Sequence, residues 1–324
     1  MSQNNLPAQF KAMAVTRFGA PEVLQQITLD MPTISSGEIL IKTLAASINP
    51  IDYKTRAGLG WAAAQNENNL PFVLGYDCFG EVVGVVDENS PFTVGDKVVA
   101  AVGFPLQAGA YGEYVVAHGA DAVKVEANQA NEISALPVAG LTAAQGLFEF
   151  GQLQANETVL ISGAAGAVGY LAVQLALDAG ANVIAVANCK DHPLLTKLGN
   201  VKLIDYNNLD EFNRLDEVDL WFDLIGGDQA LAQLKRVNVV KRLVTVPTIT
   251  AQAVNDAAVA KGAQAQGMLI SPNVEILRNL VAMVENGKLK LNIAKYMNFK
   301  LAALAHQQLE TGEIKGKVVL EFND

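Results

Sequence analysis

The sequence predicts an α/β protein in which a doubly wound parallel sheet is inserted into a mostly-β domain. Residues 158–188 read as strand, glycine turn, helix and strand, and from about residue 128 onward helical and strand patterns alternate. Before residue 128 there are short apolar runs separated by Gly, Pro and Asn, and strand-like pattern returns at 289–299 and 317–322. Both ends of the chain are therefore expected to build the mostly-β domain. The expected boundaries are 1–127 and 272–324 for that domain, and 128–271 for the inserted sheet.

The remaining elements follow in chain order. A loop-like segment at 58–69, which carries Trp61, could cover an apolar substrate or could be a plain surface loop. Helices are expected around 141–150, 273–285 and 301–311, the second ended by Asn286 and Gly287. Strands are expected at 12–16, 38–43, 80–86, 96–102, 201–205, 220–224, 242–246 and 266–270.

The stretch at 158–188 carries the main functional signal. An apolar run at 159–161 is typical of a strand buried on both faces, and Gly163, Gly166 and Gly169 follow it at three-residue spacing. An apolar helix comes next, with Gly180 in the place of a C-cap. Backbone N–H groups at such a helix N-terminus suit a pyrophosphate. The spacing differs from the usual GxGxxG fingerprint, and a turn that only packs a helix on a sheet would look similar.

Composition narrows the class of protein. The chain has 324 residues, is 51% hydrophobic and 17% charged, and carries a net charge of −10. Disorder and a nucleic-acid or anionic-membrane surface are therefore not expected. Cys78 and Cys189 form neither a disulfide framework nor a metal cluster, which favours a reducing cytoplasm. No secretory signal is recognised, and the uncharged stretch at 158–177 is interrupted by its glycines, so a buried βα unit is expected instead of a membrane span.

The residue at the end of the second strand indicates which dinucleotide binds. An acidic residue there would bind the adenosine ribose of NAD, but this position is Asn188, with Lys190 two residues later. No carboxylate repels a 2′-phosphate, and Lys190 can pair with one, so the sequence favours NADPH. Lys190 could instead lie in solvent, where Asp191 would partly offset its charge.

A set of short motifs, spread over nearly the whole chain, makes a resemblance specific. The chain resembles the zinc-free quinone oxidoreductase and enone (alkenal) reductase branch of the medium-chain dehydrogenase/reductase superfamily. That branch implies a Rossmann-type NADPH-binding domain, a GroES-like catalytic domain and a homodimer, and it uses a similar GxxGxxG turn. The motifs are Ser47-Ile-Asn-Pro-Ile-Asp-Tyr-Lys54, Leu74-Gly-Tyr-Asp-Cys-Phe-Gly80, Val94-Gly-Asp-Lys-Val98, Gly109-Ala-Tyr-Gly-Glu-Tyr114, Leu136-Pro-Val-Ala-Gly-Leu-Thr-Ala143, Gly163-Ala-Ala-Gly-Ala-Val-Gly169, Ile204-Asp-Tyr206, Phe222-Asp-Leu-Ile-Gly-Gly227 and Gly316-Lys-Val-Val-Leu320.

The resemblance also bears on zinc. Zinc-bearing relatives have Cys, His and Cys where this chain has Asn49, Tyr76 and Val138, and these three residues cannot supply thiolate and imidazole ligands. No cysteine lies in 100–114, where a structural zinc lobe would need four. We therefore expect no metal. Without a Lewis acid, oxidation of an alcohol is disfavoured, whereas an acceptor that is already electrophilic remains reactive.

The resemblance assigns roles to particular residues. Asn49 is expected near the nicotinamide, where its amide would orient the cofactor or a substrate carbonyl. Lys54 could touch the nicotinamide ribose or relay a proton, or it could be a solvent-exposed loop lysine. Asp52 could orient Lys54 or make an Asx-type turn. The expected cofactor-binding residues are Thr142, Gly163, Gly166, Ala167, Val168, Gly169, Asn188, Lys190, Tyr206, Val246, Thr248, Met268 and Ile270.

The sequence thus predicts an NADPH-dependent, zinc-independent reductase that transfers hydride to quinones or α,β-unsaturated carbonyl compounds. Two alternatives remain: an NADPH-binding sensor or partner-binding protein with little catalysis, and a zinc alcohol dehydrogenase. Cys78 is expected to be a small buried residue, and His306 a half-exposed packing residue. His118 and His192 are isolated and are not expected to be catalytic.

Overall fold

The computed structural model describes residues 6–106, 108–126 and 128–323. The chain divides into two compact units. Unit 1 comprises Met1–Val138 and Ser271–Asp324, and unit 2 comprises Ala139–Ile270. The change to unit 2 comes after Val138 because the short 3₁₀ helix Asn131–Ala135 packs on strands of unit 1, namely β3 (Glu38–Ser47), β5 (Asp77–Val85) and β16 (Lys317–Glu321).

Unit 2 is built on a six-stranded parallel sheet with the order β11-β10-β9-β12-β13-β14. The chain runs outward from β9 through β10 to β11, then returns to the other side of β9 and continues outward through β12, β13 and β14. Ligands of such doubly wound sheets bind at the carboxyl ends of the strands where this direction reverses, here beside β9 and β12. The strands are β9 (Thr158–Ser162), β10 (Asn182–Ala187), β11 (Val201–Asp205), β12 (Glu217–Asp223), β13 (Val239–Thr245) and β14 (Gln264–Gly267).

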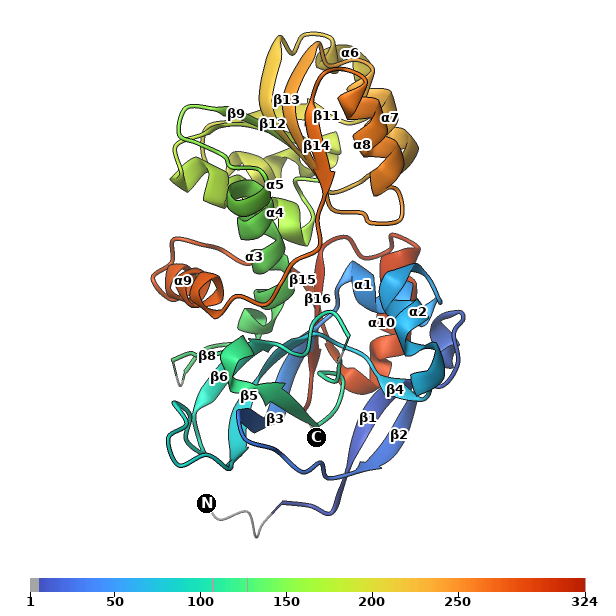
Figure 1. The fold of residues 1–324 in the computed structure, drawn as a ribbon, viewed down its shortest axis with the longest axis vertical. Helices are drawn as coiled ribbons and strands as arrows, with labels where there is room; N and C mark the ends of the chain where they lie inside the picture. Colours follow the sequence, from blue (N-terminus) through green and yellow to red (C-terminus); the bar gives the residue numbers. More distant parts are fainter. Residues whose placement is uncertain (1–5, 107, 127, 324) are drawn as a thin grey trace. The chain divides into compact units, whose positions relative to one another are not determined.

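Helices cover both faces of this sheet, as Figure 1 shows for α4 on one face and α7 and α8 on the other. The core under α7 and α8 is apolar and includes Leu160, Trp221 and Leu243. This packing confirms the predicted α/β class. The helices are α4 (Ala167–Asp178), α5 (His192–Thr196), α6 (Leu209–Phe212), α7 (Gly227–Leu234) and α8 (Ala251–Val259).

The βαβ stretch forms as the sequence predicts. Gly180 ends α4 with a φ of +77°, a conformation that glycine adopts without a Cβ penalty. Residues 158–177 form β9, the glycine turn and most of α4, and no helix among the described residues is long and apolar enough to cross a membrane. The helix expected at 141–150 differs from its prediction: α3 (Pro137–Ala144) starts earlier and continues as a π-helix over Gln145–Phe150.

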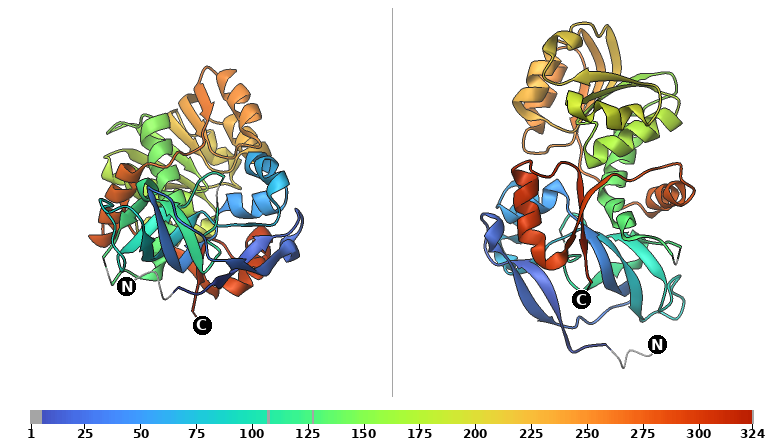
Figure 2. Two further views of the ribbon diagram at one scale, coloured as in Figure 1. Left: turned by 60° about the horizontal axis from the view of Figure 1, so that its bottom comes forward. Right: turned by 180° about the vertical axis from the view of Figure 1, so that it is seen from behind.

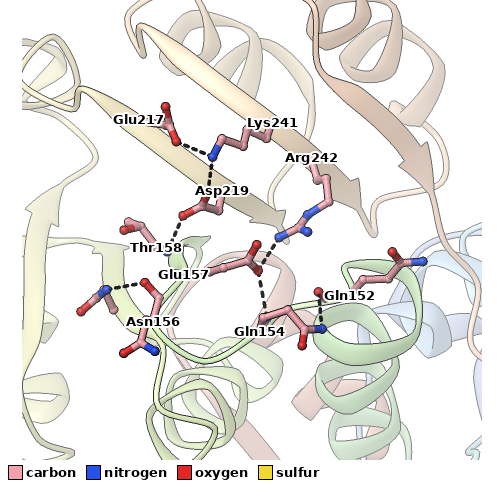
Figure 3. A network of polar contacts seen from close by, with 10 residues as sticks. Gln152, Gln154, Asn156, Glu157, Thr158, Glu217, Asp219, Lys241 and Arg242 are labelled. Atoms are coloured by element: carbon pink, nitrogen blue, oxygen red, sulfur yellow. Dashed lines mark hydrogen bonds and ion pairs between the residues drawn. The ribbon is translucent and has the colours of Figure 1, made fainter.

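A charged network joins strands at the amino ends of this sheet (Figure 3). The Arg242 guanidinium pairs with the Glu157 carboxylate at 2.5 Å. The Lys241 ammonium lies 2.8 Å from the Asp219 carboxylate, whose other oxygen accepts from the Thr158 N–H. These contacts cross from β9 to β12 and β13, so they support strand register at the edge opposite the expected cofactor site.

Unit 1 contains two sheets. One is three-stranded with the order β2-β1-β4, and the other is seven-stranded with the order β15-β16-β3-β5-β6-β8, in which β7 also pairs with β3. Strands from the C-terminal segment thus join strands from the N-terminal segment, as expected. The strands are β1 (Gln9–Val15), β2 (Leu24–Asp30), β3 (Glu38–Ser47), β4 (Phe72–Val73), β5 (Asp77–Val85), β6 (Lys97–Ala101), β7 (Tyr114–His118), β8 (Ala122–Lys124), β15 (Ile293–Asn298) and β16 (Lys317–Glu321).

Unit 1 is more helical than the sequence predicted. The segment expected to be a loop at 58–69 forms α2 (Gly60–Asn66) and a 3₁₀ turn, and α1 (Pro50–Arg56) precedes it. Helix α9 (Val274–Glu285) forms as predicted and is capped by the Asn273 side chain. Helix α10 (Ala302–Glu310) lies beside α1 and α2 in both views (Figures 1 and 2), and an Arg56–Glu310 ion pair of 2.8 Å joins α10 to α1.

Candidate functional site

The glycine turn of unit 2 brings a bare helix N-terminus to the carboxyl end of β9. Gly163 has a φ of +68°, which favours glycine, and its carbonyl accepts from the Gly166 N–H at 2.9 Å. Gly166 is the N-cap of α4, and no side chain caps this helix end. The N–H groups of Ala167 and Val168 precede the first intrahelical donor, the Tyr170 N–H, which bonds to the Gly166 carbonyl, so they have no acceptor within their own helix.

Gly169 is required for the close approach of α4 to this turn. A Cβ on Gly169 would lie 2.3 Å from the Gly163 carbonyl oxygen and 2.6 Å from the Ala164 Cα. Both are backbone atoms and cannot swing away. Gly163 and Gly169 therefore have distinct structural reasons. The turn presents helix N–H donors and the positive end of the helix dipole, which fits a pyrophosphate.

Three predicted residues gather at the carboxyl ends of β10 and β11. The Asn188 Nδ2 donates to the Tyr206 hydroxyl at 3.2 Å, and its Oδ1 accepts from the Lys190 backbone N–H at 3.0 Å. The strand register explains this, since Ala187 and Asp205 are paired and Asn188 and Tyr206 follow them. The side chain of Lys190 is exposed.

One carboxylate near this group was missed from the sequence. Asp205 ends β11, but its Oδ1 accepts from the backbone N–H and the amide of Asn207, at 2.9 and 3.0 Å. The Asn207 N–H holds the pKa of Asp205 below its usual range. The carboxylate is engaged by its own turn and keeps its negative charge; a 2′-phosphate here could pair with Lys190, and the end of β10 itself carries Asn188 in place of a carboxylate.

A buried carboxylate organises the loop at the end of β12. Asp223 accepts from the Ile225 and Gly226 N–H groups, each at 3.1 Å, and from the Thr245 hydroxyl at 2.8 Å. Burial raises its pKa. Gly226 has a φ of +68°, and a Cβ there would lie 2.3 Å from the Thr250 hydroxyl oxygen. Sequence reasoning quoted this Asp-x-x-Gly-Gly motif without giving it a role; it shapes the loop and ties it to β13.

The residues expected beside the nicotinamide follow β13 and β14. The Val246 N–H donates to the Asp223 carbonyl at 2.9 Å, and Thr248 is exposed. Because β14 ends at Gly267 and not at 270, Met268 and Ile270 lie beyond its carboxyl end, and both are buried. Thr142 lies in α3 and is also buried.

Unit 1 contains a buried polar network around Asn49 and Asp77. Asp77 directly follows Tyr76 in the sequence. The Asn49 Nδ2 donates to Asp77 Oδ2 at 2.7 Å, and the Lys317 ammonium lies 2.6 Å from Asn49 Oδ1 and 3.0 Å from Asp77 Oδ2. Asp77 also accepts from the Ser47 hydroxyl at 2.5 Å and from the Val138 N–H at 2.8 Å. Sequence reasoning missed Asp77 and Lys317, although both lie within quoted motifs.

Asp52 belongs to a second buried group. Its Oδ2 accepts from the Asn49 N–H at 2.7 Å, as in a capping box, and from the Tyr111 hydroxyl at 3.2 Å. Burial raises the pKa of Asp52 to about 7. Asp52 Oδ1 has no hydrogen-bond partner among the described residues, so no bond supports an orienting role toward Lys54. The bond from the Asn49 N–H closes a capping box at the start of α1 instead of the Asx-type turn that was the alternative.

His306 also belongs to this group. It is fully buried, with its Nε2 3.2 Å from the Tyr111 hydroxyl, so the expectation of a half-exposed histidine was wrong. Burial lowers the pKa of His306 to about 3, which keeps the ring neutral. The helical period of 301–311 identified the apolar face, but not that the ring lies within it.

Other residues singled out from the sequence lie apart from these networks. Lys54 is half-buried, and burial lowers its pKa. Cys78 is buried as expected, which raises the pKa of its thiol to about 12, whereas Cys189 is exposed. Trp61 is 51% exposed and lies on α2.

The residues at the three positions of a catalytic zinc do not fit that metal. Asn49 is bonded to Asp77 and Lys317, the Tyr76 hydroxyl donates to the Pro105 carbonyl at 2.9 Å, and Val138 offers only backbone. The Lys317 ammonium is itself a cation inside this network. Within residues 6–106, 108–126 and 128–323, no group of three or more His, Cys, Asp or Glu side chains could hold a metal ion.

Comparisons with known proteins identify the family. Residues 35–127 match the family described as "Alcohol dehydrogenase GroES-like domain" and residues 198–320 the one described as "Zinc-binding dehydrogenase". The chain is 32% identical to a 2-methylene-furan-3-one reductase of Solanum lycopersicum and 31% identical to an NADPH-dependent alkenal/one oxidoreductase, chloroplastic, of Arabidopsis thaliana, covering 98% of this chain and 80% of each relative.

A solved structure, the quinone oxidoreductase from Coxiella burnetii, is 37% identical with a TM-score of 0.91, over 97% of this chain and 100% of that one. The chain therefore belongs to the medium-chain dehydrogenase/reductase superfamily, in its quinone oxidoreductase branch.

Proposed function

We propose that this protein is an NADPH-dependent, zinc-independent reductase that transfers hydride to quinones or to α,β-unsaturated carbonyl compounds. The observation that carries the cofactor proposal is the end of β10, where Asn188 stands in place of a carboxylate and lies with Lys190 and Tyr206. The helix N-terminus at Ala167 and Val168 would bind the pyrophosphate. A relative named as NADPH-dependent supports this choice.

The class of acceptor follows from the residues around Asn49. The network there offers amide and ammonium donors, and the described residues form no group of three or more His, Cys, Asp or Glu side chains that could hold a Lewis-acid metal for alcohol activation. A quinone or a conjugated enone needs no such activation, because its acceptor atom is already electrophilic. The names of the relatives, a quinone oxidoreductase and two reductases of conjugated carbonyl compounds, support the same class.

Bound NADPH would supply the hydride, and the chain would supply position and polarity. Asn49 is proposed to act on the substrate carbonyl. Lys54, whose pKa burial lowers, is proposed to contact the nicotinamide ribose or to deliver a proton, for which water is the alternative source. Asp52 would act through Asn49, since it binds the Asn49 N–H.

A steady-state screen tests this proposal. The purified protein is assayed with NADPH and with NADH against 9,10-phenanthrenequinone, 1,4-benzoquinone and an acrolein-type enone, with and without EDTA. We expect turnover with NADPH, weaker turnover with NADH and no effect of EDTA. Tight NADPH binding without turnover would favour a binding protein, and stoichiometric zinc in elemental analysis would favour an alcohol dehydrogenase.

We also propose a homodimer in a reducing cytoplasm. Strand β14 is an edge of the unit 2 sheet, and residues Gln264, Gln266 and Gly267 on it are exposed, which leaves strand groups for pairing with a second copy. The two free cysteines suit a reducing compartment. Size-exclusion chromatography with light scattering tests the dimer, and a monomeric mass would contradict it.

A further inference from the structure

A buried cation lies beside the proposed catalytic amide. The side chain of Lys317, the first residue of β16, is 3% exposed, and that of its partner Asp77 is 0% exposed. A buried charge is costly unless it is paired and hydrogen-bonded. Here the ammonium contacts both Asp77 Oδ2 and Asn49 Oδ1, so the cost is offset by one carboxylate and one amide oxygen.

These two charged partners determine how the Asn49 carboxamide is oriented. An ammonium only donates, so the atom facing Lys317 at 2.6 Å must be the amide oxygen. A carboxylate that already binds an ammonium accepts, so the atom facing Asp77 at 2.7 Å must be the amide nitrogen. The flipped amide would face a donor with a donor, and the orientation is therefore fixed by chemistry. One of the two Nδ2 hydrogens is donated to Asp77, and no bond of the second is found among the described residues.

The sheet holds the same atoms in place. Ser47 in β3 and Asp77 in β5 are cross-strand partners, and Ser47 also pairs with Val319 of β16. The Ser47 hydroxyl and the Val138 N–H occupy the two oxygens of Asp77, at 2.5 and 2.8 Å. The Asp77 carboxylate therefore has little rotational freedom. Because the Asn49 amide bonds to this carboxylate, it is held in place as well.

We propose that Lys317 and Asp77 are positioning residues that hold the Asn49 carboxamide so that its second N–H donates to the carbonyl oxygen of the acceptor. This rests on the proposed function. When an enone takes a hydride, a C–H bond forms at its β-carbon and the π pairs shift to leave negative charge on the carbonyl oxygen; a proton from solvent or Lys54 then completes the α-carbon. The two electrons come from the oxidation of NADPH to NADP⁺. A fixed N–H donor stabilises the oxyanion as it develops.

The test compares a charge-neutral pair of substitutions with a surface control. Lys317→Met alone would leave Asp77 buried and unpaired, so the double variant Asp77→Asn/Lys317→Met removes both charges at similar volume. Lys317→Arg keeps the charge and serves as the conservative rescue. Lys300→Met, at an exposed lysine of the same unit, is the matched control.

Kinetics and NMR give separate readouts. We expect the double variant to stay folded with a lower melting temperature, because an amide at position 77 can accept in place of only one of the two Asp77 oxygens. Its Kd for NADPH should be unchanged, while kcat for an enone falls roughly tenfold or more with little change in KM. Lys317→Arg should recover part of the loss, and Lys300→Met should match wild type. In ¹⁵N-resolved NMR the Asn49 side-chain NH₂, assigned by its loss in Asn49→Ala, should show one proton protected from exchange in wild type and neither in the double variant.

Wild-type kcat in a folded double variant would overturn the proposal, as would an unchanged Asn49 NH₂ signal. Equal losses in melting temperature, NADPH affinity and kcat would also overturn it, because they would indicate a purely structural ion pair. If the wild-type protein turns over no acceptor, the proposed function fails, and the NMR comparison still decides whether Lys317 and Asp77 hold the amide.

Discussion

Replacing Gly169 with alanine tests the glycine turn most sharply. The added Cβ would lie 2.3 Å from the Gly163 carbonyl oxygen and 2.6 and 2.9 Å from the Ala164 backbone. To bring the added Cβ to an ordinary van der Waals distance from these atoms, α4 would have to move by about 1 Å. Overpacking of this kind costs about 1–3 kcal/mol, which exceeds the gain of up to about 1 kcal/mol from the better helix propensity of alanine. The same movement displaces the N–H groups of Ala167 and Val168.

Loss of one charge-assisted hydrogen bond is worth about 1.5–3 kcal/mol, so the Kd for NADPH should rise at least about tenfold. Thermal unfolding followed by circular dichroism and calorimetric titration with NADPH measure the two effects. Gly262→Ala is the control, because Gly262 has a φ of +89° but nothing within 4 Å of its added Cβ. It should cost about 1–2 kcal/mol of stability and leave the Kd unchanged. A Gly169→Ala protein with wild-type stability and Kd would show that α4 needs no glycine at this approach.

Three further outcomes are expected. Lys190→Met should raise the Kd for NADPH about tenfold and leave that for NADH unchanged in fluorescence titrations, and equal effects on both would contradict a phosphate contact. The pKa of Asp52 is about 7 in the folded protein against 3.8 for the free group, so the folded state holds a proton that the unfolded state releases. Stability measured by urea unfolding should therefore fall as pH rises from about 4 to about 7, and Asp52→Asn should flatten this fall. Ellman's reagent should label Cys189 in the native protein and Cys78 only after unfolding, since Cys78 is buried.

The unit 2 fold could be predicted from the sequence because its signals are local. The apolar run of β9, the three glycines and the capping Gly180 lie within one stretch, and the structure confirms the strand, turn, helix and strand. Helix α1 was missed although Asn49, Pro50 and Asp52 form a recognisable helix start. In the sequence analysis these residues were treated as part of a loop.

The polar network of Asn49, Asp77 and Lys317 in unit 1 could not be predicted from the spacing of these residues in the sequence. Lys317 and Asp77 are 240 residues apart, and only the pairing of β16 with β3, and of β3 with β5, brings them together. The burial of His306 is of the same kind, because it depends on the packing of α10 near Tyr111. Local pattern identified the amphipathic helix, but tertiary contacts decided which polar residue is enclosed. The roles of the expected cofactor-binding residues stay predictions.

The central claim is hydride transfer from NADPH to the electrophilic carbon of a conjugated acceptor. Reduction of an enone with NADPH deuterated at C4 tests it directly, with the product examined by NMR and mass spectrometry. We predict one deuterium at the β-carbon of the saturated carbonyl compound, from whichever C4 face the enzyme uses. Deuterium at the carbonyl carbon of an allylic alcohol would contradict hydride transfer to the β-carbon, and no product at all would contradict enone reduction.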